Sequence, residues 1–310
     1  MTQAIKINDS THEPESLVVQ PTDGNMPSND KKSLPSRHWL AELSLSFKLR
    51  GTKTTLSRIK HLGPLRVQRP FYPEDDCCHV YLLHPPGGIA AGDKLSIEFN
   101  AEHSTRVLLT TPSAGKVYGS DEQCSPQRQV VRGRLAKGSC LEWFPQETII
   151  FSGAEINLET HFDLGEDAKL CGWDILCLGR RASGERFENG NCTQLITVTK
   201  NSQTLMRERM QLRGGEQSLQ SPWGLGGNVV VGTFYATISA SRQQIDDWRQ
   251  ALAELELSGE WGISQKPNLF LARYLGQSAA QAKSGFELLW KCLRPDLNGR
   301  VACRPRIWNT

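Results

Sequence analysis

The decapeptide His-Pro-Pro-Gly-Gly-Ile-Ala-Ala-Gly-Asp, residues His84 to Asp93, contains two prolines and three glycines. An apolar run at 80–83 precedes it, and an alternating run at 94–99 follows it. Its prolines fix φ and remove backbone donors, while its glycines permit positive φ and close backbone approach. We therefore predict that one strand enters a rigid, tightly turned loop and that a second strand leaves it. A structural turn is favoured over a ligand loop, because the glycines match neither the P-loop nor the dinucleotide pattern.

Short strands are predicted on both sides of this loop. Upstream, apolar residues alternate with polar ones from Leu43 to Leu49, and Thr52 to Ile59 forms a second candidate. Downstream, the candidates are 106–110, 129–134, 139–143, 148–151, 155–162, 170–178 and 194–199. Glycine, proline and asparagine separate them at short intervals, which is typical of a predominantly β protein. No fixed-period repeat is found, so periodicity alone leaves sandwich, barrel and solenoid open.

Helical signals come late in the chain. Ser241 is a candidate N-cap for a helix with apolar residues at Ile245, Trp248, Leu252 and Leu255, and Gly259 follows as a stop signal. Residues 269–275 and 279–293 are further helical candidates, the second ending before Pro295. The pattern therefore predicts a β body with a helical section towards the C-terminus.

The amino-acid composition limits the classes of protein to which this chain can belong. The 310 residues are 38% hydrophobic, which is enough for a packed core, and the formal net charge is only +3. This balance gives no reason to expect nucleic acid or a membrane surface as a partner. No apolar run approaches the length of a transmembrane helix. With no secretory leader and an odd number of cysteines, nine, we expect a cytoplasmic protein with reduced thiols.

Two regions are distinguished by their polar character. Residues 1–37 are rich in Ser, Asp, Asn, Pro and Lys, so we predict a disordered or weakly ordered tail before a single domain at 38–310. The C-terminal end is locally basic, and a solvated surface is favoured there over a docking site. Its basic residues are Lys291, Arg294, Arg300, Arg304 and Arg306.

Metal-ligating residues are sparse. Cys77 and His79 are two apart in a candidate strand, so they share a face, and both types bind transition metals. No Cys-x-x-Cys pair supports them, and a buried cysteine beside a surface histidine is the favoured interpretation. Cys171 and Cys177 share a face in the same way, which favours a buried apolar stripe over a thiolate pair.

Catalytic motifs are not recognisable. The chain has no Gly-x-Ser-x-Gly elbow, and Thr110 stands where a P-loop ending at Lys116 needs glycine, so no nucleotide binding is predicted. Polar residues nevertheless interrupt the apolar strands and loops. They are Asp93, Lys116, Glu142, Gln146, Glu147, Asp174, Arg180 and Glu185.

Two interpretations of this polar set stay open. Isolated buried charges are costly, so internal ion pairs, such as one between Asp174 and Arg180, are favoured. The alternative is a water-filled passage lined by oxygen ligands, which hard or borderline cations could traverse because they bind there weakly.

Several motifs, in order, resemble the UreD (UreH) family of urease accessory proteins, from about Leu40 to the C-terminus. Besides His84–Asp93, they lie at 109–112, 141–149, 173–180, 184–187 and 305–308. Two departures stand out: Ala91 replaces a glycine, and the run Val117 to Ser120 lacks an arginine that family members carry after the lysine matching Lys116. A methyl group at residue 91 requires a negative φ.

The resemblance implies a fold and a function. The fold is mainly β, with an elongated, superhelical or solenoid-like β body and a few α-helices towards the C-terminus. The function is that of a non-catalytic scaffold and nickel conduit, which docks on the urease apoprotein and recruits UreF, which in turn binds the GTPase UreG. Nickel is then in transit and no cofactor is stably bound. The eight polar residues become candidates for tunnel or interface, and Cys77 and His79 remain weak metal candidates.

Two other functions compete with this one. A nickel-storage protein predicts tight binding through His and Cys, but the seven histidines are scattered along the chain. A hydrolase or lyase working on a β-solenoid groove predicts a convergent acid–base pair. Glu142 and Glu147 are candidates for it, but nothing in the sequence places them together. Nickel affinity separates a store from a conduit, and turnover identifies an enzyme.

Overall fold

The computed structural model describes residues 39–309, and the tail predicted at 1–37 lies outside them. Within that part, the first sheet contains β1 (Leu40–Arg50), β2 (Lys53–Leu62), β5 (Lys94–Ala101), β8 (Gln127–Leu135), β11 (Ala154–Leu164), β13 (Gly190–Lys200) and β14 (Gln203–Arg213). The second contains β3 (Arg66–Val67), β4 (Cys78–Leu83), β6 (Arg106–Thr110), β7 (Gly115–Val117), β9 (Cys140–Phe144), β10 (Thr148–Ile150), β12 (Lys169–Leu178), β15 (Val230–Ala236), β16 (Glu260–Lys266) and β17 (Leu269–Gly276). The helices are α1 (Arg242–Glu254) and α2 (Ala279–Asn298), with 3₁₀ turns at Arg181–Ser183, Gln217–Leu219 and Arg306–Asn309. The prediction of a mainly β protein is confirmed.

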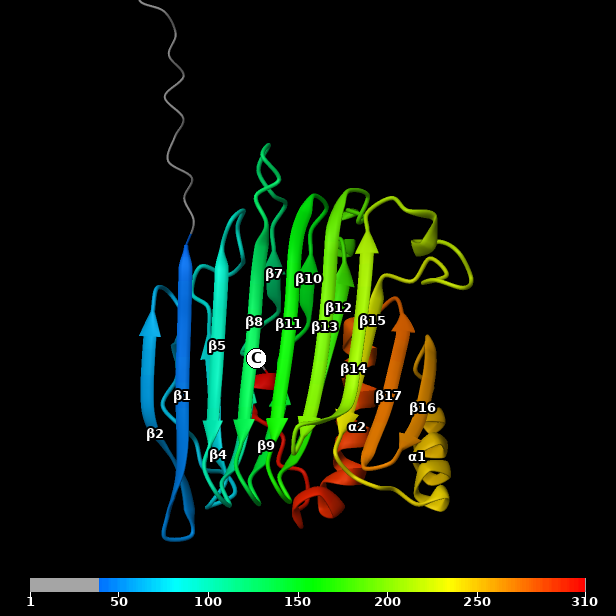
Figure 1. Ribbon diagram of the computed structural model, residues 1–310. Helices are drawn as coiled ribbons and strands as arrows, with labels where there is room; N and C mark the ends of the chain where they lie inside the picture. The colour runs from blue at the N-terminus through cyan, green and yellow to red at the C-terminus, as the bar shows by residue number, and fades with distance from the viewer. Residues whose placement is uncertain (1–38, 310) are drawn as a thin grey trace, which may run out of the picture. The chain divides into compact units, whose positions relative to one another are not determined.

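The chain alternates between the two sheets (Figure 1). The seven-stranded sheet has the order β14-β13-β11-β8-β5-β1-β2, and the main path of the ten-stranded sheet is β16-β17-β15-β12-β9-β6-β4-β3. Between β4 and β13, the parallel pairs are β4–β6, β5–β8, β6–β9, β8–β11, β9–β12 and β11–β13. A parallel pair needs a crossover, and here a strand of the opposite sheet supplies it. The sheets have free edges and form no closed barrel.

The His84–Asp93 loop is one of these crossovers, because it leads from β4 in one sheet to β5 in the other. Gly87 and Gly92 both have φ of +78°, a conformation that favours glycine. Gly88 is required for space instead, since an added Cβ would lie 2.5 Å from the Tyr118 ring. Ala91 does not adopt a positive φ, so its methyl group is tolerated as expected.

Apolar side chains that alternate with polar ones along the strands form two hydrophobic cores. Phe47, Phe99 and Phe162 lie between the sheets, whereas Trp173 and Phe286 lie between the ten-stranded sheet and α2. Cys171 belongs to the second core and Cys177 packs against it, which confirms the buried stripe predicted there. Each large apolar side chain contributes about 1.5–3 kcal/mol by leaving water.

The helical predictions are confirmed in part. Ser241 caps α1 in a capping box, in which its hydroxyl accepts from the Gln244 amide at 3.2 Å. The helix predicted at 269–275 is wrong: the segment is β17, whose side chains are buried on both faces. α2 does not end before Pro295 but continues to Asn298, because this last turn buries Leu297 completely in the second core. Neither α1 nor α2 is long and apolar enough to cross a membrane.

Candidate metal centre and polar network

A buried arginine joins α2 to the ten-stranded sheet. Arg294 has no solvent exposure, and its Nε and Nη2 each donate to a carboxylate oxygen of Glu142 at 2.8 Å. Trp290, one turn earlier on α2, donates its indole N–H to Glu142 Oε1 at 2.6 Å. The guanidinium also donates to both oxygens of Glu74, with Nη2 at 2.8 Å from Oε2. One cation therefore bridges two carboxylates from different parts of the chain.

Strand register places His79 beside this bridge. His79 of β4 pairs with Leu108 of β6, and Leu108 pairs with Glu142 of β9, so His79 and Glu142 lie in one row. Neighbouring strands are about 4.8 Å apart, so roughly 10 Å separates the two backbones. Glu74, from the loop before β4, lies close to both: its Oε2 is 3.0 Å from His79 Nε2 and also accepts from Arg294.

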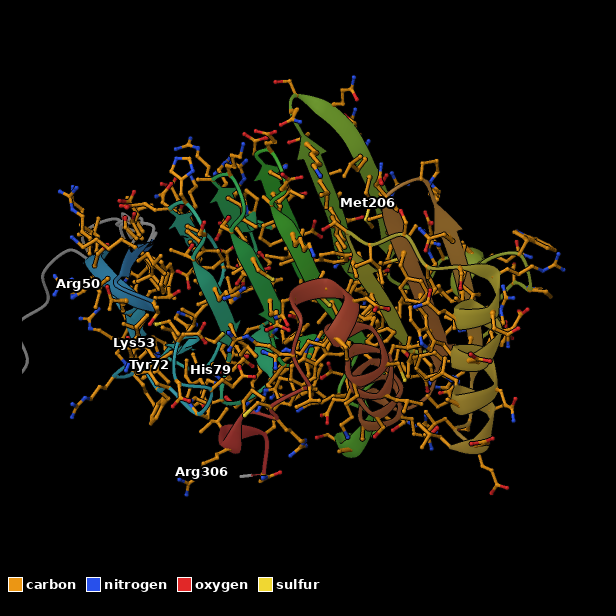
Figure 2. The ribbon with its side chains drawn as sticks, turned by 90° about the horizontal axis from the view of Figure 1, so that it is seen from below. Arg50, Lys53, Tyr72, His79, Met206 and Arg306 are labelled. Carbon is orange, nitrogen blue, oxygen red and sulfur yellow. The ribbon has the colours of Figure 1, made fainter. Side chains whose placement is uncertain are left out.

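The candidate metal-binding set consists of Glu74, Cys77 and His79. One ligand atom from each lies within 4.8 Å of the others. His79, labelled in Figure 2, has no solvent exposure, so the prediction of a surface histidine beside a buried cysteine is wrong for the histidine. Its Nδ1 is buried without a hydrogen-bond partner. Sequence reasoning missed Glu74, although an acidic run, Glu74 to Asp76, directly precedes Cys77.

The charges within the network perturb its acid–base groups. Burial raises the pKa of the Cys77 thiol well above its usual value, and the Glu142 and Glu74 carboxylates add to this rise. Burial also tends to raise the pKa of Glu74, but hydrogen bonds from Arg294 and His79 outweigh it and lower that pKa to about 2. Burial opposes the charge of Arg294, yet the two carboxylates raise the pKa of its guanidinium overall.

The basic C-terminal end agrees only in part with the prediction of a solvated surface. Lys291, Arg304 and Arg306 are exposed as expected, whereas the buried Arg294 contradicts the prediction. Arg294 is buried, Arg300 donates to Asp76 with Nη2 to Oδ2 at 2.6 Å, and Arg304 donates to Glu287 at 2.8 Å. The Arg300–Asp76 pair holds the segment after α2 against the ten-stranded sheet, because Asp76 lies just before β4, and the Arg304–Glu287 pair holds the same segment against α2.

Asp174 and Arg180 do not form the ion pair suggested by the sequence. Asp174 accepts a hydrogen bond from the Tyr235 hydroxyl at 3.3 Å, between the two sheets. Burial raises the pKa of Asp174 to about 7, although the Tyr235 bond opposes the rise. Arg180 instead donates from Nε to Glu185 at 2.8 Å and lies 4.5 Å above the Phe151 ring.

The other predicted residues lie in different places. Asp93 accepts from the Ala90 amide at 2.8 Å and so stabilises the crossover loop. Gln146 accepts from Lys283 Nζ of α2 at 2.6 Å. Glu147 is partly buried after β9, and Lys116 is exposed on β7. The predicted polar set is therefore not one cluster.

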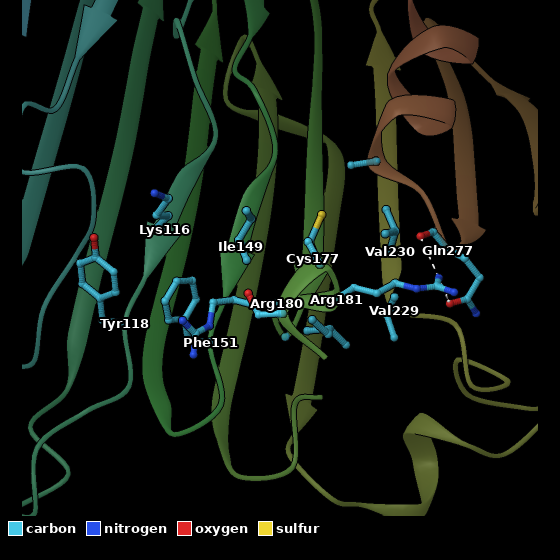
Figure 3. Close-up of a pocket in the computed structure, with 15 residues that line it drawn as sticks. Lys116, Tyr118, Ile149, Phe151, Cys177, Arg180, Arg181, Val229, Val230 and Gln277 are labelled. Atoms are coloured by element: carbon cyan, nitrogen blue, oxygen red, sulfur yellow. Dashed lines mark hydrogen bonds between the residues drawn. The ribbon is translucent and has the colours of Figure 1, made fainter. Parts of the chain in front are cut away.

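Two cavities lie beside these residues. One, of about 430 Å³, extends from the crossover loop between the sheets and is lined by His84, Lys116, Gln129, Trp143 and Gln146 among others. The indole N–H of Trp143 is buried there without a partner. Figure 3 shows the other, of about 540 Å³, lined by Lys116, Cys177, Arg180 and Arg181. Lys116 lines both cavities.

Comparison with known proteins places the chain in a family. Residues 40–309 match the family model described as UreD urease accessory protein. The chain belongs to the UreD family. The resemblance inferred from the ordered motifs is thereby confirmed, over the same part of the chain.

Curated UreD proteins are similar over nearly their whole length. The chain is 46% identical to the urease accessory protein UreD of Saccharophagus degradans, over 90% of this chain and 96% of that protein. It is 43% identical to UreD of Nitrosococcus oceani, over 90% and 93%, and 42% identical to UreD of Methylobacillus flagellatus, over 88% and 95%. The relatives carry the name of an accessory protein rather than of an enzyme.

Proposed function

We propose that this chain is a non-catalytic scaffold that assists the insertion of nickel into urease in the cytoplasm. The observation that carries the proposal is the UreD match, which spans 40–309 and therefore both sheets and both helices. In this proposal the chain docks on the urease apoprotein and recruits UreF, and the GTPase UreG joins through UreF. In this proposal the strands that alternate between the two sheets form the superhelical β body that the family resemblance implies.

The nickel path in this proposal runs through the cavity between the sheets. Gln129 offers an amide oxygen to it, and His84 offers an imidazole. Ligands of this kind bind a borderline cation weakly enough to release it, which delivery requires. Burial lowers the pKa of His84, with the Asp93 charge opposing this, so the imidazole is favoured in the neutral form that can accept a metal.

Partner docking is tested by co-purification. The tagged full-length chain is expressed with urease subunits, UreF and UreG, and captured with and without UreF. The proposal expects urease and UreF to bind the chain directly, and UreG to be retained only when UreF is present. Capture of UreG in the absence of UreF, or failure to capture urease, would contradict the proposed order of assembly.

A further inference from the structure

Strand β2 is a free edge of the seven-stranded sheet, and Figure 1 shows it at the outer side of that sheet. It pairs with β1 alone, and its residues from Ser57 to Leu62 are all exposed. Its beginning is held by the loop before β4, because the Thr54 amide donates to the Asp76 carbonyl at 2.9 Å. We propose that residues 57–62 bind an extended, acidic segment of a partner protein as an added antiparallel strand. This surface has no role in the proposed function, so the two can be tested separately.

The backbone of this edge is available for pairing. In an antiparallel strand, every second residue points both its N–H and its C=O group to the same side. Half of these groups in 57–62 therefore point away from β1, and no strand lies on that side in the part of the chain that the structure describes. A row of free donors and acceptors is a template for another strand, and an added strand is a common mode of peptide recognition.

Exposed apolar side chains gather at the same edge. Four of the nine large apolar residues that are exposed between 39 and 309 lie at the start of β1 or on the exposed part of β2. They are Trp39, Leu40, Ile59 and Leu62, with exposed fractions of 46–54%. Strand β14, the other edge of this sheet, carries none of the nine. Apolar side chains grouped in this way among polar ones are typical of an interaction site.

The strand register assigns these side chains to the two faces of the sheet. Ile59 pairs with Leu45, whose side chain is buried in the core between the sheets, so Ile59 lies on the inner face. Arg58, Lys60 and Leu62 alternate with Ile59 or its equivalents and lie on the outer face. A strand added to this edge therefore covers Ile59 with one of its faces and Leu62 with the other.

The charge of the edge selects an acidic partner. β2 contains three cationic residues, Lys53, Arg58 and Lys60, and no acidic one. Neither Arg58 nor Lys60 forms an ion pair with a described residue. Opposite charges on neighbouring strands stabilise a sheet, and like charges destabilise it. Carboxylates opposite Arg58 and Lys60 therefore favour the added strand.

The same charges disfavour a second copy of this chain as the occupant. A two-fold pair of β2 strands centred on Ile59 places Arg58 of each copy opposite Lys60 of the other, which sets like charges against each other. Lysine on an edge strand is one of the features by which proteins prevent such pairing. An acidic segment meets no such repulsion, so the edge discriminates between the two occupants.

The register also specifies the pattern of the partner segment. Read from its N-terminus, the segment has an apolar residue opposite Leu62, any residue opposite His61, an acidic residue opposite Lys60, an apolar residue opposite Ile59 and an acidic residue opposite Arg58. The core sequence Val-Thr-Glu-Val-Glu meets this pattern with residues of high β propensity at three positions.

The test is binding of a capped, fluorescent peptide with this core to the purified full-length chain. Anisotropy measures affinity, and hydrogen exchange locates the bound peptide. We expect saturable binding of one peptide per chain and slower exchange of the amides in 57–62. Two N-methylated forms of the peptide, each modified at one set of alternate residues, separate strand pairing from charge attraction. Only the set that faces β2 should abolish binding, because its amides are the donors.

Charge reversal tests the selectivity of the edge. Arg58→Glu/Lys60→Glu should bind the peptide at least about fivefold more weakly, because two attractive pairs become repulsive ones. It should also gain affinity for a peptide with lysine in place of both glutamates. The matched control is Lys94→Glu/Arg134→Glu, which changes the net charge equally at exposed residues of β5 and β8, strands that are paired on both sides. The control should bind the acidic peptide as the parent does.

The outcomes decide between an added strand and its alternatives. Loss of affinity confined to the edge variant, with slower exchange in 57–62, supports the added strand. A parent chain that does not bind the acidic peptide, or binds it no better than Arg58→Glu/Lys60→Glu does, would overturn the proposal. So would an equal loss in the Lys94→Glu/Arg134→Glu control or unchanged binding of both N-methylated peptides, because net charge alone would then hold the peptide.

Discussion

Arg294 of α2 and Glu142 of β9 form a buried ion pair across 152 residues of sequence, with two N–O distances of 2.8 Å. Breaking a buried pair leaves one charge uncompensated, which costs about 3–5 kcal/mol. Arg294→Ala should therefore lower the free energy of unfolding by about this amount. The measurement is the denaturant midpoint and slope of the variant and its parent.

The control is an exposed pair of the same type. Arg213 and Glu216 are 3.2 Å apart, with side chains 55% and 47% exposed. Surface pairs contribute only about 0.2–1 kcal/mol, so Arg213→Ala should have a small effect. Equal losses in the two arginine variants would show that the Arg294 bridge has no special part in stability.

Asp174 makes stability depend on pH. Its pKa is raised from 3.8 to about 7 in the folded protein, so the folded state keeps a proton that the unfolded chain releases. The stabilising contribution is complete below pH 3.8 and is lost as pH rises through about 7. Asp174→Asn keeps the acceptor for Tyr235 but cannot ionise. Above pH 7 it should be more stable than the parent by on the order of 1–4 kcal/mol.

Unfolding free energies at the two ends of this pH range check the prediction. Near pH 3.8 the Asp174→Asn variant and the parent should be almost equal. Asp167→Asn is the control, since Asp167 is exposed and its φ of +53° suits asparagine. A constant difference between Asp174→Asn and the parent at all pH values would mean that the carboxyl group does not titrate differently on folding.

Gly88 of the crossover loop should not accept a side chain. A methyl group there would lie 2.5 Å from the Tyr118 ring, and overpacking of this kind costs about 1–3 kcal/mol. Thermal unfolding of Gly88→Ala should show this loss, and the double variant Gly88→Ala/Tyr118→Ala should show that the two effects are not additive. Gly262→Ala is the control, because nothing lies within 4 Å of its added Cβ. Additive effects at residues 88 and 118 would exclude the clash.

Blocking the cavity between the sheets tests it as the nickel path. Ala114 lines that cavity, whereas Ala182 lines the neighbouring one. Ala114→Trp should reduce urease-bound nickel to the level found without the chain, while urease and UreF still co-purify with it. Ala182→Trp should load urease normally. Normal loading with Ala114→Trp would remove this cavity from the path.

Local pattern predicted most of the β body. Alternation and turn residues located β1, β5, β6 and β11 because these signals act over a few residues. The helix prediction for 269–275 was wrong for the same reason. A short apolar run fits a buried strand or a helix equally well, and here pairing with β15 and β16 makes the segment a strand. The prediction that α2 ends before Pro295 was wrong because the packing of Leu297 outweighs the helix-breaking effect of proline.

The candidate site depended on contacts that periodicity does not contain. Arg294 and Glu74 are 220 residues apart, and only the parallel register brings His79 and Glu142 into one row. One local signal was available: Arg294 follows Trp290 by four residues and precedes Leu297 by three, so a charge stands on the apolar face of α2. Such a charge indicates a buried partner rather than the solvated surface expected there.

Under the proposed function, this chain is needed for nickel to enter urease. Urease subunits, UreF and UreG are expressed with nickel, with or without the chain, and urease is purified for nickel content and urea hydrolysis. Urease made without the chain should be nickel-poor and inactive, and adding the chain should restore its nickel content and its activity. Fully loaded, active urease made in the absence of the chain would contradict the proposed function.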